Sequence, residues 1–102
     1  NKIPTRRLAR MSDEEVVECL TKVKGIGRWT AEMFLIFVLN RPDVWPVDDL
    51  GLREAARLAW KLKERPTPKG LIALGEHLRP HRTAATWYLW RSLGVATKQR
   101  AR

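Results

Sequence analysis

The chain has 102 residues, of which 44% are hydrophobic, and this is enough for one globular domain but not two. Twenty basic residues stand against eleven acidic ones, and the net charge of +9 points to a polyanion as partner. The chain has no apolar run of about 18 residues, so no membrane span is expected, and its one cysteine cannot form an internal disulfide or a zinc site.

Helix signals recur along the first half of the chain. A short helix is expected over residues 5–11, and Ser12 to Glu15 then read as a capping box that starts the next helix. Residues 24–27 break that helix. A further helix is expected over residues 28–39, and because it is apolar on nearly every side, we expect it to be buried in the centre of the fold.

The second half predicts three more helices, and strand signals stay weak throughout. Asp48 and Asp49 open the first of them, with Asp48 as N-cap or structural neighbour. Thr67 followed by Pro68 is a typical helix start. Gly94 is expected to cap the end of the last helix. The three helices are expected over residues 49–62, 67–78 and 82–93, so the sequence predicts an all-α helical bundle.

The turn between the second and third predicted helices is the most informative segment. Glycines on both sides of one apolar residue allow a tight turn and leave backbone N–H groups uncovered. The helix that follows presents its free N–H groups and positive dipole end at the same point, an arrangement that binds phosphate without reading sequence. An ordinary helix–turn–helix corner is the alternative. We predict DNA contact by Lys24, Gly25, Ile26, Gly27 and Arg28, with Ile26 inserted into the core.

This segment, LTKVKGIGRWTA, resembles the hairpin of the helix-hairpin-helix-GPD superfamily of DNA glycosylases. The GPD part of that signature is a Gly/Pro-containing loop that ends in an aspartate, and residues 39–49 read LNRPDVWPVDD. Together with GIGRWTAEM and RPHRTAATWYLWR, the run RPDVWPVDDLGLR is most similar to bacterial alkylbase (3-methyladenine) DNA glycosylases. The resemblance covers roughly residues 5–94.

Members of this superfamily are usually longer than this chain. The resemblance therefore implies that residues 1–102 form a single helical domain from the C-terminal part of a longer glycosylase. The helix-hairpin-helix would occupy about residues 12–40, and the loop that carries the aspartate would occupy residues 41–49.

The resemblance assigns the catalytic carboxylate to Asp49. Cleavage of an N-glycosidic bond builds positive charge on the sugar, and a nearby carboxylate stabilises that charge or orients the attacking water. Judged from the residues alone, Asp48 and Asp49 are more simply explained as N-capping acids.

The resemblance also predicts an aromatic pocket for a base that has left the helical stack. Trp29 and Trp90 match aromatic positions of the family, and Met33 is included as a third substrate-binding residue. An alkylated purine is cationic and is attracted to an aromatic face. The other tryptophans are expected in the core: Trp45, Trp60 and Trp87. Members that also nick the strand carry a lysine where this chain has Trp29, which implies a monofunctional enzyme.

No cofactor is expected to be required. An iron–sulfur cluster, present in some members, is not expected because Cys19 is the only cysteine. A monovalent cation held by the backbone carbonyls of Thr21, Val23 and Ile26 is implied by position alone. The expected partner is double-stranded DNA with alkylated bases, without an obligate protein partner or a membrane, in the bacterial cytoplasm at the nucleoid.

Two other functions stay open from the sequence. The hairpin and the basic charge are also typical of a non-catalytic helix-hairpin-helix DNA-binding module. A glycosylase for another damaged base, such as uracil or a mismatched purine, fits the same motifs. Arg82, in RPHRTAA, matches a recurrent family arginine and is expected to be structural or to lie near the site.

Overall fold

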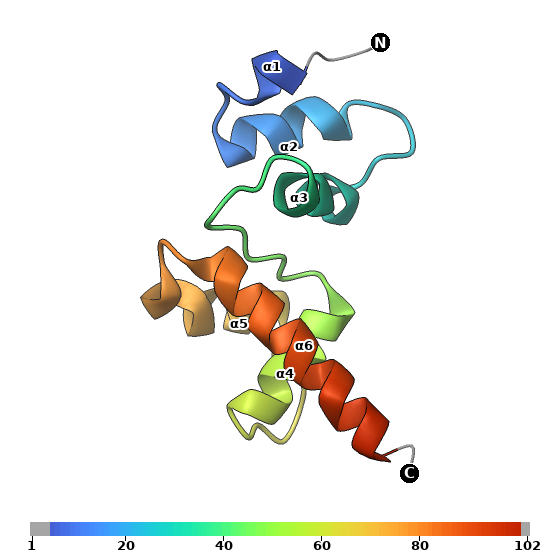
Figure 1. Cartoon of the computed structure of the whole chain (residues 1–102), viewed down its shortest axis with the longest axis vertical. Helices are drawn as coiled ribbons and strands as arrows, with labels where there is room; N and C mark the ends of the chain where they lie inside the picture. Colours follow the sequence, from blue (N-terminus) through green and yellow to red (C-terminus); the bar gives the residue numbers. More distant parts are fainter. Residues whose placement is uncertain (1–4, 101–102) are drawn as a thin grey trace.

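The computed structural model describes the backbone of residues 5–100 and the side chains of residues 6–94, and every regular element in that range is helical. The predicted all-α fold is therefore confirmed. The elements are α1 (Thr5–Leu8), α2 (Asp13–Thr21), α3 (Arg28–Phe37), α4 (Leu50–Ala59), α5 (Pro68–Gly75), the 3₁₀ helix η1 (Glu76–Leu78) and α6 (Arg82–Arg100) (Figure 1).

The helices form two groups that are joined by the loop from Val38 to Asp49. Figure 1 shows α1, α2 and α3 at one end of the molecule and α4, α5 and α6 at the other. Each group has its own hydrophobic cluster, the first around Leu35 and the second around Leu52. The radius of gyration is 14.8 Å, above the value of about 13 Å typical of a compact domain of this length. The two-part, elongated shape accounts for the difference.

The first group is built on the packing of α2 against α3. The predicted capping box is present, since Ser12 Oγ accepts from the N–H of Glu15 and the Glu15 carboxylate accepts from the N–H of Ser12. Ala31 is fully buried where the two helices meet. The side chains at this contact belong to the first cluster: Val16, Val17, Ala31, Leu35 and Ile36.

The prediction that α3 is buried on all sides is wrong. Four of its side chains are buried, Ala31, Glu32, Leu35 and Ile36, while those of Phe37 and the following Val38 are about half exposed. The reason is that α2 covers only one face of α3. Apolar residues on the other face lie at the edge of the first group, next to the site described below.

Two predicted helix ends also differ from the structure. The third helix ends at Phe37, two residues early, and Asn40 takes a left-handed backbone with φ 53°. The last helix does not end at Gly94 but continues to Arg100. A glycine inside a helix costs only about 1 kcal/mol relative to alanine, so by itself it does not terminate one.

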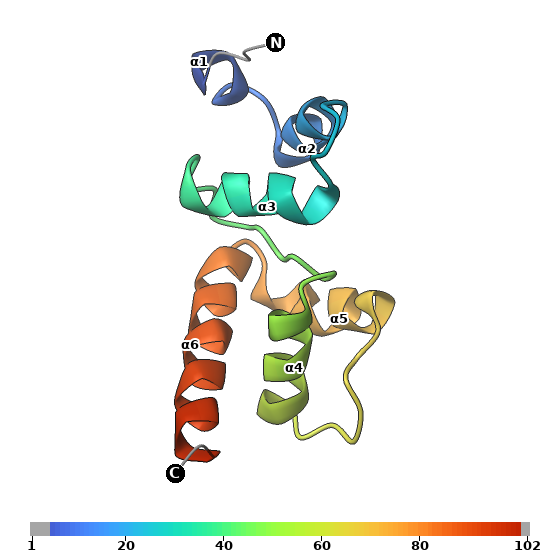
Figure 2. The ribbon, with the colours of Figure 1, turned by 90° about the vertical axis from the view of Figure 1, so that its right-hand side faces the viewer.

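In the second group, α4 and α6 run side by side, and α5 lies next to α4 on the side away from α6, at a steep angle to it (Figure 2). Trp45 is buried against them and donates its indole N–H to the carbonyl of Leu71 at 2.8 Å. A side chain at Gly75 would clash with the Trp45 ring, so the glycine makes this packing possible. Trp60 is partly buried on the same cluster. The core positions predicted for Trp45 and Trp60 are thus confirmed.

The first turn of α6 fixes the loop between the groups. Thr83 Oγ1 donates to the carbonyl of Arg41 at 2.6 Å and accepts from the N–H of Val44 at 2.8 Å. Arg82 binds both carboxylate oxygens of Asp43, at 2.7 and 3.0 Å. These contacts determine where the loop delivers the residues that follow it, and they confirm that Arg82 is structural. Within residues 5–100, no helix is both long enough and apolar enough to cross a membrane.

Candidate active site

Asp49 lies where the loop ends and α4 begins. Its carboxylate Oδ2 accepts from the backbone N–H of Leu52 at 2.7 Å, and its own N–H donates to the carbonyl of Pro46 at 2.9 Å. Asp49, and not Asp48, is therefore the N-cap of this helix. The side chain of Asp48 is exposed, whereas that of Asp49 is held at the helix start.

Two tryptophans from different helices converge on this carboxylate. The indole N–H of Trp29, in α3, donates to Oδ1 at 2.6 Å. The indole N–H of Trp90, in α6, donates to Oδ2 at 2.9 Å. The structure thus brings together residues that are distant in sequence, since Trp29 lies 20 positions before Asp49 and Trp90 lies 41 positions after it.

Three N–H donors consequently surround Asp49, two from indoles and one from the Leu52 backbone. Donors of this kind orient a carboxylate and compensate its negative charge at a fixed position. The Trp29 side chain remains 48% exposed, so one edge of the site faces solvent. The arrangement supplies a fixed anion beside an open aromatic surface, which suits stabilisation of positive charge on a reacting group.

The aromatic surface beside Asp49 is larger than the sequence indicated. Phe37 stacks parallel to Trp90 with ring centroids 6.2 Å apart, and the Trp87 ring is nearly perpendicular to both, with centroid distances of 5.1 and 5.5 Å. Trp87 is 47% exposed, so its predicted core position is wrong. Trp87 and Trp90 are three residues apart on one helix, a spacing that places them on the same face. No sequence pattern of this kind links Phe37 to the two tryptophans, because it lies on a different helix.

Met33 lies four residues after Trp29 on α3, at a spacing that places the two on one face. Its side chain is partly buried and packs against the first hydrophobic cluster. Its predicted contact with substrate stays a prediction.

The hairpin turn lies between α2 and α3, and its two glycines occupy their positions for different structural reasons. Gly25 has φ 92°, a backbone conformation that side chains disfavour. Gly27 has an extended backbone and is the N-cap of α3, with no side-chain cap and no atom within 4 Å of an added Cβ. The N-terminus of α3 is therefore open. Ile26 is only half buried and lies outside both clusters, so it does not fill the core as expected.

The charged residues of the hairpin differ in how far they are already engaged. Lys24 is exposed. Arg28 makes two hydrogen bonds with Glu14, at 3.0 and 3.1 Å, and lies 3.5 Å from Glu32. The guanidinium of Arg28 thus has carboxylate partners within the chain, whereas the ammonium of Lys24 projects into solvent beside the open helix end.

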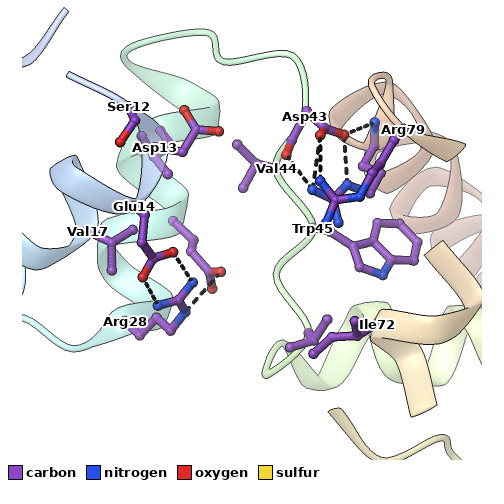
Figure 3. A pocket seen from close by; sticks show the side chains of 14 residues that line it. Ser12, Asp13, Glu14, Val17, Arg28, Asp43, Val44, Trp45, Ile72 and Arg79 are labelled. Atoms are coloured by element: carbon purple, nitrogen blue, oxygen red, sulfur yellow. Dashed lines mark hydrogen bonds and ion pairs between the residues drawn. The ribbon is translucent and has the colours of Figure 1, made fainter. Parts of the chain in front are cut away.

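A separate cavity of about 620 Å³ lies between the two helix groups, and Asp49 is not among its lining residues. Figure 3 shows the Glu14–Arg28 pair on one wall and the Asp43–Arg79 pair on the other. The hydrogen bonds from Arg82 hold the pKa of Asp43 on this second wall below its usual value.

Glu32 lines this cavity and is only 5% exposed. Among the described residues, no donor lies within hydrogen-bond distance of its Oε1. Burial raises the pKa of Glu32 to about 7, against the smaller opposing effect of Arg28. The sequence did not predict a functional role for Glu32, because it lies in a run of apolar residues that is typical of a buried helix.

Comparison with known proteins gives consistent relatives, although no family model matches the chain. It is 50% identical over 95 residues to DNA-3-methyladenine glycosylase 1 of Schizosaccharomyces pombe, which covers 92% of this chain and 42% of that protein. It is 36% identical over 86 residues to the putative DNA-3-methyladenine glycosylase YfjP of Bacillus subtilis, covering 84% of this chain and 30% of that protein. The chain thus spans less than half the length of these curated relatives.

Solved structures agree with the sequence relatives. The 3-methyladenine DNA glycosylase Mag1 of S. pombe, solved with abasic DNA, superposes with a TM-score of 0.80 at 50% identity, over 84% of this chain and 42% of that one. DNA-3-methyladenine glycosidase of Bacillus halodurans gives 0.85 at 38% identity, over 94% and 44%. The chain is therefore homologous to part of the 3-methyladenine DNA glycosylases and has the fold of that part, which is of the helix-hairpin-helix-GPD type.

Proposed function

We propose that this chain carries the DNA-binding hairpin and the catalytic carboxylate of a base-excision-repair glycosylase. The reaction is hydrolysis of the N-glycosidic bond of a flipped alkylated purine such as 3-methyladenine. The observation that carries the proposal is the convergence of Trp29 and Trp90 on Asp49, at 2.6 and 2.9 Å. The names of the relatives supply the reaction class.

Asp49 would act on the sugar. As the bond to the base breaks, positive charge develops on the sugar carbon, and a carboxylate held in a fixed position stabilises that charge without having to reorganise. The same carboxylate can orient the water that attacks the carbon. The proton of that water has a ready acceptor in the carboxylate.

The base would lie against the indoles next to this carboxylate, with Met33 as a further contact. A cationic alkylated purine is attracted to the face of an electron-rich ring, and it is already a good leaving group. Trp29 stands where strand-nicking relatives are expected to have a lysine. The proposed enzyme therefore releases the base by hydrolysis alone, without a lyase step.

The hairpin would hold the DNA backbone. The open N-terminus of α3 at Gly27 offers uncapped N–H groups to a phosphate, and Lys24 adds positive charge beside it. The relative from S. pombe was solved with abasic DNA, which supports DNA as the partner here as well. We further propose that the enzyme is bacterial and works in the cytoplasm at the nucleoid.

A monovalent cation in the hairpin is a further part of this proposal. Carbonyl oxygens are suitable ligands for such an ion, and those of Thr21, Val23 and Ile26 come from the end of α2 and the turn. The Val23 carbonyl accepts from the N–H of Ile26 at 3.1 Å, which still leaves one lone pair. A bound cation would add positive charge next to the phosphate site. The proposed chemistry needs no other cofactor.

The test is release of methylated bases from alkylated duplex DNA by the wild type and by Asp49→Asn. Asparagine is also a good N-cap, so α4 should persist. We expect Asp49→Asn to lower the rate of release at least about a hundredfold, the usual scale for loss of a group that stabilises transition-state charge. DNA affinity, measured by fluorescence anisotropy, should stay within about twofold because the hairpin is unchanged.

Other outcomes would assign a different function. Equal release by both proteins would return Asp49 to a purely capping role. DNA binding without release of any base would identify a non-catalytic helix-hairpin-helix module. Release of uracil or of a mismatched purine in place of methylated bases, in a panel of duplexes, would identify a glycosylase of another specificity.

A further inference from the structure

The two oxygens of Asp49 are held by different parts of the molecule. Oδ2 is held from within the second helix group, by the N–H of Leu52 in α4 and by Trp90 in α6. Oδ1 is held by Trp29, which belongs to α3 in the first group. The hydrogen bond from Trp29 therefore joins the hairpin group to the carboxylate.

Of the three hydrogen bonds to the Asp49 carboxylate, the one to Oδ1 is exposed and the two to Oδ2 are partly buried. A Cβ added to Gly51 would lie 3.2 Å from Oδ2, so this oxygen is packed closely against α4. Oδ2 also caps that helix, and the cap is lost if this oxygen moves away. The bond to Oδ1 lies at the solvent-exposed edge of the site.

Trp29 is also connected directly to the hairpin. It lies two residues after Gly27, in the first turn of α3, so the backbone that would bind a phosphate also positions its indole. The N–H group lies in the plane of the ring. Donation to Oδ1 therefore leaves the faces of the ring free to stack on a base.

We propose that Trp29 is a positioning residue: its indole N–H sets the direction of Oδ1 and links the location of the hairpin on DNA to the location of the carboxylate. This inference rests on the proposed role of Asp49 in the reaction. Without this donor, Oδ1 has no protein partner among the described hydrogen bonds, and the carboxylate can tilt about its anchored Oδ2. Misplacement of a reacting group lowers the rate and not the DNA affinity.

Trp29→Phe tests this inference because it removes the N–H group and keeps an aromatic face. Trp60→Phe is the matched control, since Trp60 is partly buried in the second hydrophobic cluster and makes no contact with Asp49 in the described structure. We expect Trp29→Phe to lower the single-turnover rate of base release about tenfold, equivalent to one hydrogen bond to a charged group, with unchanged DNA affinity. Trp60→Phe should keep the rate within about twofold.

A rate for Trp29→Phe equal to that of the wild type would overturn the inference, as would a loss confined to DNA affinity, which is the signature of a stacking wall alone. Nuclear magnetic resonance gives a readout that does not depend on activity. The indole ¹H–¹⁵N signal that disappears in Trp29→Phe should shift in Asp49→Asn, and an unshifted signal would show that the hydrogen bond is absent in solution. Failure of the proposed function is seen separately, as lack of base release by the wild type.

Discussion

Two helix N-termini, those of α3 and α4, differ in how their free backbone N–H groups are capped. At α4, the side chain of Asp49 caps the helix and is itself held by two indoles. At α3, the N-cap is Gly27, with no side-chain cap and open space around it. One N-terminus is thus capped by a side chain of the molecule, and the other has no side-chain cap among the described residues.

The difference shows how one structural element serves two purposes. A helix N-terminus attracts negative charge whatever its source. Where the source is a side chain of the same protein, as with Asp49, the result is a carboxylate held in a fixed position. Where no side chain supplies it, as at Gly27, free N–H groups remain, and in the function proposed here they bind a phosphate.

The largest effect on DNA binding should come from giving the uncapped N-terminus of α3 a carboxylate cap like the one at α4. Gly27→Asp places a carboxylate where a phosphate would bind, and the open space accommodates the side chain. We expect DNA affinity to fall about 10- to 100-fold, while the free energy of unfolding rises by about 0.5–1 kcal/mol through capping and the helix dipole. Anisotropy titrations and urea unfolding measure the two changes. Unchanged affinity would remove the α3 N-terminus from the DNA interface.

Glu32, one turn into α3, sharpens the comparison because it is a carboxyl group without the donors that surround Asp49. Its folded-state pKa of about 7 lies above the ordinary 4.5, so the folded protein binds the extra proton between these values and the free energy of unfolding falls as pH rises through this window. Glu32→Gln should abolish that fall. At pH 8 the variant should exceed the wild type by about 3 kcal/mol, from the conversion of about 1.4 kcal/mol per pKa unit.

Urea unfolding of both proteins at pH 5 and pH 8 measures this effect. The difference between the proteins matters, since other titrating groups are common to both. A constant difference at the two pH values would mean that Glu32 is ionised throughout, held by Arg28.

A third prediction is that alanine substitutions at the two glycines of the hairpin lower the free energy of unfolding by different amounts. Gly25→Ala forces a side chain into a backbone with φ 92°, and we expect the free energy of unfolding to fall by about 1–2 kcal/mol. Gly27→Ala, where the backbone is extended, should lower it by less than about 1 kcal/mol. Thermal unfolding of the two variants tests this order, and equal losses would contradict it.

The smallest effect concerns the N-terminus of α4, which Asp49 caps. Gly51→Ala brings a methyl group 3.2 Å from Asp49 Oδ2, so the carboxylate must move by a few tenths of an ångström. We expect base release to slow about three- to tenfold, the cost of a small misplacement, while α4 gains up to about 1 kcal/mol from the better helix former. Single-turnover kinetics and thermal unfolding should therefore change in opposite directions. A faster or unchanged reaction would show that Oδ2 tolerates displacement.

Local patterns in the sequence predicted the features that depend on neighbouring residues. The capping box at Ser12, the start of α5 at Thr67 and the glycine turn at Gly25 are decided within a few residues, and each is present. The end of the last helix at Gly94 was predicted wrongly, because one glycine is too weak a signal to stop a helix whose other residues favour it.

The sequence by itself determined the all-helical class and the glycine turn of the hairpin, and it predicted Asp49 as the catalytic carboxylate, since propensity, spacing and resemblance all act along the chain. The tertiary structure decided which groups meet. Only the packing of α3 and α6 around the loop brings Trp29 and Trp90 onto one carboxylate, exposes Trp87 beside Phe37, and leaves Glu32 buried without a donor for Oε1 in the described residues. These outcomes depend on contacts between residues distant in sequence, which no local pattern records.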